Sequence, residues 1–226
     1  MSGLKKGDCK LIDLSHTLEH GMVTYKDLPG PVISDYLTRK ASEAHYAQGT
    51  SFHIGRIDMV ANTGTYIDSP FHRYADGKDL SELSLESVAN LDGIVFSADP
   101  AERPVTRDLF RNVNVRAKAV LIRTGWDRYW GTDKYFEGHP YLTRDAAEYL
   151  RDCGASLVGI DSLNIDDTSD GQRPIHSILL KADIPVVEHL CNLSRLPASG
   201  FSFYAVPVKV KKFGTFPVRA FAVIYE

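Results

Sequence analysis

Several features common in membrane, nucleic-acid-binding and secreted proteins are missing from this 226-residue sequence. It has no apolar run near the roughly 20 residues that a membrane-spanning helix needs. No apolar stretch of a secretory signal follows Lys5 and Lys6. The 26 basic residues do not exceed the 29 acidic ones, whereas most nucleic-acid binders carry a basic excess. We therefore expect neither a membrane nor a nucleic acid as a partner.

Cysteine is also scarce, with three residues at wide and unrelated spacings, Cys9, Cys153 and Cys191. That number and spacing exclude a disulfide framework and a CxxC-type metal site. A reducing compartment suits such a chain, so we expect a cytoplasmic protein.

The pattern of apolar residues predicts a mixed α/β fold. No repeat, low-complexity tract or long linker divides the chain, so we expect one domain over residues 1–226. A helix should follow the N-cap Thr143 and stop at Gly154, a second should begin at Pro174, and a shorter one is expected over 106–112. Strands are expected at 11–14, 32–38, 52–60, 93–97, 119–123, 156–160, 184–187, 203–210 and 218–225.

The densest group of polar residues lies in segment 62–77, NTGTYIDSPFHRYADG. Asp68 and His72 stand four residues apart there, and Pro70 between them rigidifies the backbone and disfavours a helix. A carboxylate and an imidazole on such a loop suit metal binding or general acid–base catalysis. The same pair also occurs in ordinary turns, where the aspartate caps a backbone amide, so both interpretations stay open.

A second pair of candidates is His176 and Glu188. Glu188 ends the apolar run IPVV, where a carboxylate needs a partner. His189 should face the opposite side of that strand and is not counted as a ligand. With Asp68, the pair forms a ligand set that suits zinc, manganese, iron or magnesium without choosing among them, although His176 alone also fits a structural histidine.

The other motifs that we considered do not indicate a functional site. The acidic segment 160–170, IDSLNIDDTSD, lacks EF-hand spacing and is expected to be a solvated loop. Within it, Asp161 is a candidate for orienting the site by contacting a ligand side chain rather than the metal. The sequence has no GxSxG elbow, no Walker-type loop and no dinucleotide fingerprint.

The window 62–72, NTGTYIDSPFH, resembles the motif H-x-G-T-H-x-D-x-P-x-H of the cyclase family of metal-dependent hydrolases, which includes kynurenine formamidases and isatin hydrolases. The resemblance extends to DLSHTLEHG near the start, LIRTGW at 121–126, VGID at 158–161 and the ending VPVKV…FPVRAF. It implies the swivelling β/β/α fold and a homodimer or higher homo-oligomer. The implied activity is metal-dependent hydrolysis of a C–N bond in a small amide or cyclic amide.

Transferred residue by residue, the resemblance implies that Asp68, His176 and Glu188 bind metal and that His72 is the acid and base. Asn62 and Tyr66 occupy the positions of the two other motif histidines. An amide oxygen is a weak ligand, and a phenol with a pKa of about 10 must lose its proton to bind well. We therefore expect one divalent ion, with zinc or manganese favoured, rather than two.

The expected mechanism uses metal-bound water as nucleophile, while His72 transfers a proton to the leaving nitrogen. Asn62, Tyr66 and Tyr25 are expected to contact a small-molecule substrate. Phe71 and Trp126 are further candidates for an aromatic pocket wall.

Two alternatives accompany this hypothesis. In the first, a metal-free enzyme uses Asn62, Tyr66 and His72 as a hydrogen-bonding and acid–base cluster, for hydrolysis or for a dehydrating ring closure. In the second, the chain is a catalytically silent small-molecule binding protein on the same fold. Its motivation is the replacement of two ligands at once.

Overall fold

A nine-stranded mixed sheet forms the centre of the computed structural model, which describes residues 9–225. The strand order is β1-β13-β11-β5-β7-β9-β10-β4-β12. The bounds are β1 Cys9–Asp13, β4 Tyr66–Asp68, β5 Leu91–Ser97, β7 Lys118–Arg123, β9 Leu157–Ile160, β10 Val186–Glu188, β11 Ser199–Tyr204, β12 Thr215–Pro217 and β13 Phe221–Tyr225. Strands β5, β7, β9 and β10 run parallel, and antiparallel strands flank them on both sides. The predicted mixed α/β class is confirmed.

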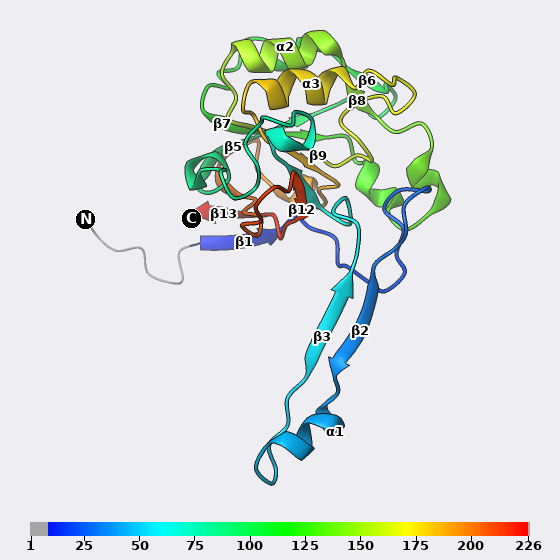
Figure 1. Cartoon of the computed structure of the whole chain (residues 1–226). Coiled ribbons are helices and arrows are strands. Elements are labelled where there is room, and N and C mark those ends of the chain that lie inside the picture. The colour runs from blue at the N-terminus through cyan, green and yellow to red at the C-terminus, as the bar shows by residue number, and fades with distance from the viewer. Residues whose placement is uncertain (1–8, 226) are drawn as a thin grey trace, which may run out of the picture.

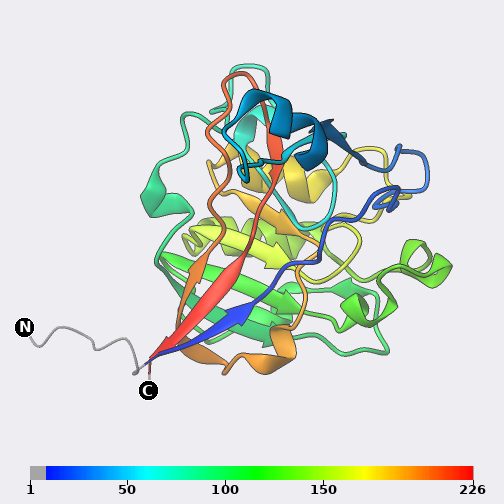
Figure 2. The same cartoon turned by 90° about the horizontal axis from the view of Figure 1, so that it is seen from below.

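The two ends of the described chain meet in this sheet. Strands β1 and β13 are antiparallel neighbours, as Figure 2 shows from below. Lys5 and Lys6, considered above for a secretory signal, lie outside the described residues. Within residues 9–225, no helix has the length and apolar character that crossing a membrane requires.

Two helices cover one face of the sheet, α2 (Arg144–Asp152) and α3 (Pro174–Lys181) (Figure 1). Both begin where their N-terminal signals predict. Helix α2 buries Ala146, Ala147 and Leu150 against the sheet side. The helix expected over 106–112 is instead a single 3-10 turn, Arg107–Phe110. One turn gains few hydrogen bonds, and the backbone becomes extended directly afterwards, at Arg111.

The central strands are buried on both faces, which explains their continuous apolar runs. In β7, Val120 and Ile122 belong to the core beneath the helices, whereas Ala119 and Leu121 belong to the core on the opposite face. This alternation follows from the two-residue period of a strand.

The last two strands differ from the prediction. Strand β11 ends at Tyr204, and an irregular segment follows where a strand over 203–210 is expected. Pro207 lies in that segment and has no N–H to donate to a ladder. Strand β13 begins only at Phe221, because Val218 donates to the Thr65 carbonyl and so continues the pairing of β12 with the segment of β4.

A long arm projects from the body of the molecule (Figure 1). It consists of the antiparallel strands β2 (Val32–Leu37) and β3 (Ile54–Asp58), with the short helix α1 (Arg39–Ser42) near the tip. Every residue of the two strands except Leu37 is exposed. A separate pair of short parallel strands, β6 (Pro104–Val105) and β8 (Tyr141–Leu142), lies beside the helices.

Gly214 allows the segment before β12 to approach the turn that carries His72. A Cβ atom at Gly214 would lie 2.5 Å from the His72 backbone nitrogen and 2.6 Å from its Cα atom. The Gly214 carbonyl also accepts a hydrogen bond from the Ser69 N–H at 2.7 Å. Close backbone approach therefore ties β12 to the predicted catalytic segment.

We expect Gly214→Ala to lower the free energy of unfolding by about 1–3 kcal/mol, because the added methyl group overlaps backbone atoms. Urea denaturation measures this change. Gly171→Ala is the matched control, because a Cβ atom there meets no atom within 4 Å. Equal stability of the two variants would contradict the close approach.

Candidate active site

Strand pairing places four polar side chains on one face of the sheet. Tyr66 and Asp68 are two residues apart on β4 and therefore point to the same side. Glu188 on β10 lies opposite Tyr66, and Thr215 on β12 lies opposite Asp68. Directly opposed residues of antiparallel strands share a face.

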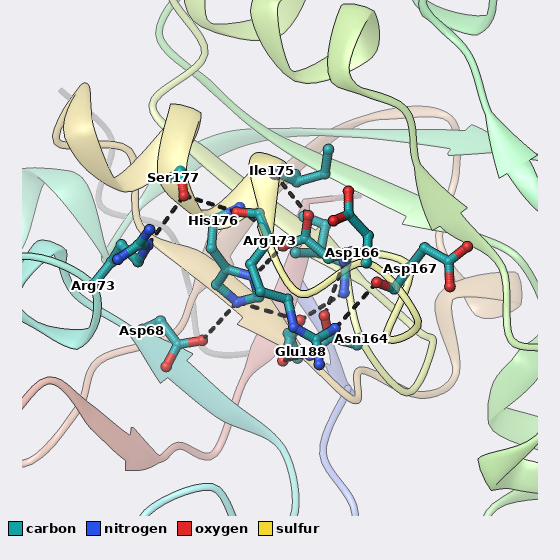
Figure 3. A network of polar contacts seen from close by, with 12 residues as sticks. Asp68, Arg73, Asn164, Asp166, Asp167, Arg173, Ile175, His176, Ser177 and Glu188 are labelled. Carbon is teal, nitrogen blue, oxygen red and sulfur yellow. Dashed lines mark hydrogen bonds and ion pairs between the residues drawn. The ribbon is translucent and has the colours of Figure 1, made fainter.

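His176, on the first turn of α3, completes this group from the helix side (Figure 3). Its Nε2 atom lies 3.5 Å from Asp68 Oδ2 and 3.6 Å from Glu188 Oε1. The carboxylates of Asp68 and Glu188 are fully buried, and His176 is nearly so. The structure thus brings together the three residues that sequence analysis proposed as metal ligands.

Asp166 fixes the orientation of His176. Its Oδ2 atom accepts a hydrogen bond from His176 Nδ1 at 2.6 Å. The same carboxylate caps α3 by accepting from the N–H groups of Ile175 (2.7 Å) and His176 (3.1 Å). Because an ionised carboxylate only accepts hydrogen bonds, Nδ1 carries a proton. In the neutral imidazole, the lone pair of Nε2 then faces Asp68 and Glu188.

The expectation of a solvated loop over 160–170 is wrong for its first part, because Asp161, Asn164 and Asp166 are all buried. Asp161 does not orient the site. It accepts hydrogen bonds from Thr124 and from the Gly125 N–H and so orders a different turn. Asp166 has the orienting position instead, and the sequence offered no signal that separates it from the other carboxylates of this segment.

His72 lies at the end of the 3-10 turn Pro70–His72 and is the most exposed member of the group. Thr215 Oγ1 hydrogen-bonds to Asp68 Oδ1 and lies 2.7 Å from His72 Nδ1. The hydroxyl has one proton, which goes to the carboxylate, so it accepts from Nδ1. This tautomer leaves His72 Nε2 as an acceptor, which has no hydrogen-bond partner among residues 9–225. Thr215 lies 143 positions from His72 in the chain, and no sequence pattern indicated its contact.

Tyr66 and Tyr25 surround Glu188. The Tyr66 hydroxyl donates to Glu188 Oε2 at 2.5 Å, and the Tyr25 hydroxyl lies 2.8 Å from that of Tyr66. The Ile165 N–H donates to Glu188 Oε1 at 2.6 Å. Burial raises the pKa of Glu188 to about 7. Burial and the nearby Glu188 raise the pKa of Tyr66 well above its usual value, so the phenol keeps its proton.

The buried charges of the site fit a divalent cation. Asp68, Asp166 and Glu188 are buried carboxylates, and within residues 9–225 none of them forms an ion pair with lysine or arginine. Burial alone lowers the pKa of His176, but the surrounding carboxylates, Glu188 first, raise it well above its usual value. At neutral pH one imidazolium does not balance the charges of Asp68, Asp166 and the partly protonated Glu188. Buried charges without counter-charge are costly.

Two observations indicate that a cation would fit beside Asp68. Asp68 Oδ2 is buried and has no hydrogen-bond partner in the described part of the chain. Asp68, His72 and His176 also offer ligand atoms that lie within 4.8 Å of one another. Carboxylates and imidazoles are ordinary ligands for zinc and manganese, so the residues present fit a metal ion beside Asp68.

A cavity of about 470 Å³ opens over these groups. Tyr25, Asn62, Tyr66 and His72 line it, as the sequence analysis expected of a substrate pocket. Phe71 and Trp126 do not line it. Trp126 packs with Tyr135 and Leu163 in a separate cluster and donates its indole N–H to the Tyr135 carbonyl.

These features define a buried carboxylate–imidazole centre at one end of a mixed α/β sheet. Residues 12–167 match the family described as "Putative cyclase", and the chain therefore belongs to the cyclase family.

Individual relatives agree with this assignment. The chain is 28% identical to a kynurenine formamidase of Geobacillus thermodenitrificans, over 92% of this chain and 95% of that protein. Isatin hydrolase A from Labrenzia aggregata has the same fold, with a TM-score of 0.84 and 21% identity over 100% of this chain and 97% of that one. A "predicted metal-dependent hydrolase" from Bacillus stearothermophilus has a TM-score of 0.74 and 26% identity over 95% and 98% of the two chains. The predicted cyclase-family fold is confirmed.

We expect Asp166→Asn to weaken metal binding by about 10- to 100-fold, the usual effect of removing the partner that orients a metal-binding histidine. Titration of the metal-free protein with zinc, followed by calorimetry, measures the affinity. Asp167→Asn is the matched control, because Asp167 is the neighbouring carboxylate and makes no contact with His176. Equal zinc affinity of the two variants would contradict the orienting role of Asp166.

Proposed function

We propose that the protein hydrolyses a C–N bond of a small amide or cyclic amide with the help of one divalent ion. Asp68, His176 and Glu188 hold the ion, and His72 is the acid and base. The observation that carries this proposal is the buried Asp68 Oδ2 atom, which has no hydrogen-bond partner among residues 9–225 and lies 3.5 Å from His176 Nε2. The kynurenine formamidase relative, which matches nearly the whole chain, supports hydrolysis of an amide bond.

When bound, a divalent ion polarises a carbonyl group and makes water more acidic. The chain's own residues handle the proton. His72 lines the cavity, and its Nε2 atom is free to accept a proton from the attacking water. The water oxygen bonds to the carbonyl carbon, the C–N bond breaks, and His72 returns the proton to the leaving nitrogen. Thr215 holds the His72 ring in the tautomer that this transfer requires.

Tyr66 supports one ion rather than two. A histidine at its position would offer a nitrogen lone pair to a metal ion. The Tyr66 hydroxyl instead donates a hydrogen bond to Glu188 Oε2. Its raised pKa disfavours the phenolate that would bind a metal. Asn62, at the other substituted motif position, lines the cavity as a neutral amide suited to hydrogen bonding with substrate.

We expect elemental analysis to find one divalent ion per chain in protein purified without chelator. His176→Ala should lose this ion, because it removes the imidazole beside Asp68 and Glu188. His72→Ala should keep the ion and lose amide hydrolysis by about 100-fold or more, the usual contribution of an acid–base group. Loss of the ion in His72→Ala would instead make His72 a ligand.

Chelation separates this proposal from a metal-free enzyme and from a silent binding protein. We expect exhaustive dialysis against a chelator to abolish formamide hydrolysis and added zinc or manganese to restore it. Activity that survives chelation and depends on Tyr66 would favour the metal-free enzyme. A metal-loaded protein that binds amides, lactams and esters without turning them over would favour the binding protein.

We also propose a homodimer, in which the arm packs on a second copy of the chain. A two-stranded hairpin is marginally stable alone in water. Here Ile33 and Ile57 form a cross-strand pair on one face of the hairpin, and both side chains are exposed. Exposed apolar side chains gathered on one projecting element are typical of an interaction surface.

We expect wild-type protein to show twice the mass of the chain in light scattering, and Ile57→Asp to show the mass of one chain. Ser34→Asp adds the same charge to the opposite face of the hairpin and is the matched control. A monomeric wild-type protein would contradict the homodimer.

A further inference from the structure

Two arginines stand at the cavity from different parts of the chain. Arg73 directly follows His72, and Arg173 directly precedes Pro174, the first residue of α3. Both line the same cavity as His72, His176 and Glu188. Figure 3 shows them on different sides of the His176 ring.

The hydrogen bonds of both guanidinium groups supply no counter-charge, and the Arg73 guanidinium also lies over the Tyr74 ring, 5.6 Å from its centroid. Arg73 Nε donates to the Ser177 hydroxyl at 3.1 Å, and Arg173 Nη1 donates to the Asp167 carbonyl at 3.3 Å. Both acceptors are neutral oxygens. Within residues 9–225, neither arginine forms an ion pair with a carboxylate. Each contact fixes one nitrogen and leaves other N–H donors for a ligand.

Backbone hydrogen bonds hold the turn that carries Arg173. Its backbone is left-handed, with φ 48° and ψ 59°, a conformation that side chains other than glycine rarely adopt. The backbone N–H groups of Ile175 and His176, in the first turn of α3, donate to Asp166. These hydrogen bonds hold the turn. The arrangement that orients His176 therefore also sets the position of Arg173.

The cavity has a negative group and positive groups in different places. The buried Glu188 is the carboxylate that lines the cavity, next to the proposed ion, whereas Arg73 is exposed and Arg173 is half-buried. Arginine binds carboxylates through two parallel N–H···O bonds, a geometry that a neutral amide cannot match in strength. The amide side chains that line the cavity are neutral, namely those of Asn62, Asn164 and Gln172.

We propose that Arg73 and Arg173 bind a carboxylate of the substrate, which is therefore a small amide that carries an acid group beside the scissile C–N bond. This proposal rests on the proposed amide hydrolysis for its reaction, but not for its binding step. The arginines are specificity-determining residues. They attract an anion to the cavity and set its position relative to His72.

The test compares two formamides of the same shape, N-formylphenylalanine and its neutral carboxamide, with release of formate as the readout. We expect zinc-loaded wild-type protein to prefer the carboxylate by about 10- to 100-fold in kcat/KM, the value of a charge-assisted hydrogen bond. Arg73→Gln and Arg173→Gln should each reduce this ratio, mainly through KM, and the double variant should bring it near one.

Arg128→Gln is the matched control, because Arg128 is exposed and does not line this cavity. It removes the same charge and should keep the wild-type ratio. A ratio near one in the wild type, or an unchanged ratio in the double variant, would overturn the proposal.

Calorimetric binding of N-formylphenylalanine to the zinc-loaded protein separates this proposal from the proposed function. If neither formamide is hydrolysed, the proposed reaction fails. Binding that weakens at least tenfold in the double variant, at unchanged zinc content, still supports the arginine site. Absent binding, or equal affinity in wild type and double variant, overturns it.

Discussion

The buried carboxylate of Asp68 is the constraint on which the rest of the site depends. Asp68 lies on a short strand between β10 and β12, completely shielded from solvent. One oxygen interacts with Thr215, and the other faces His176 without a donor among residues 9–225. An ionised carboxylate in such a place needs a cation. The neighbouring strands, α3 and the 3-10 turn at His72 all supply groups toward that position.

Two partners prepare the imidazoles for different tasks. Asp166 bonds the Nδ1 atom of His176 and caps α3 at the same time, so one carboxylate sets both the start of the helix and the orientation of the His176 ring. Thr215 bonds both Asp68 and His72 Nδ1. In the proposed mechanism, the Nε2 atom of His72 then accepts the proton. On the other side, Tyr66 replaces a lone pair with a hydrogen-bond donor and holds Glu188. In the proposed one-ion site, Asp68, His176 and Glu188 hold the ion, while Tyr66 and Asn62 line the cavity as neutral hydrogen-bonding groups.

The sequence predicts those parts of the structure that depend on local signals. The runs at 119–123 and 156–160 are strands because two buried faces require continuous apolar residues, and Thr143 and Pro174 mark real helix starts. The motif around Asp68 and His72 and the distant His176 and Glu188 indicate the site residues.

Contacts that arise only from tertiary packing escape such signals. Asp166 lies in an acidic segment that looks solvated, and its burial depends on α3 folding over it. Thr215 reaches His72 because β12 pairs with β4, a register that no local pattern specifies. The two arginines likewise come to one cavity from segments a hundred positions apart. Tertiary structure, rather than motif, sets the polarity of the pocket.

The most direct test of the central claim is an anomalous difference map from crystals grown with zinc. The account predicts a single zinc peak per chain, within bonding distance of Asp68 Oδ2 and His176 Nε2, and no second peak beside Asn62 and Tyr66. Two peaks, or a peak away from Asp68, would contradict it.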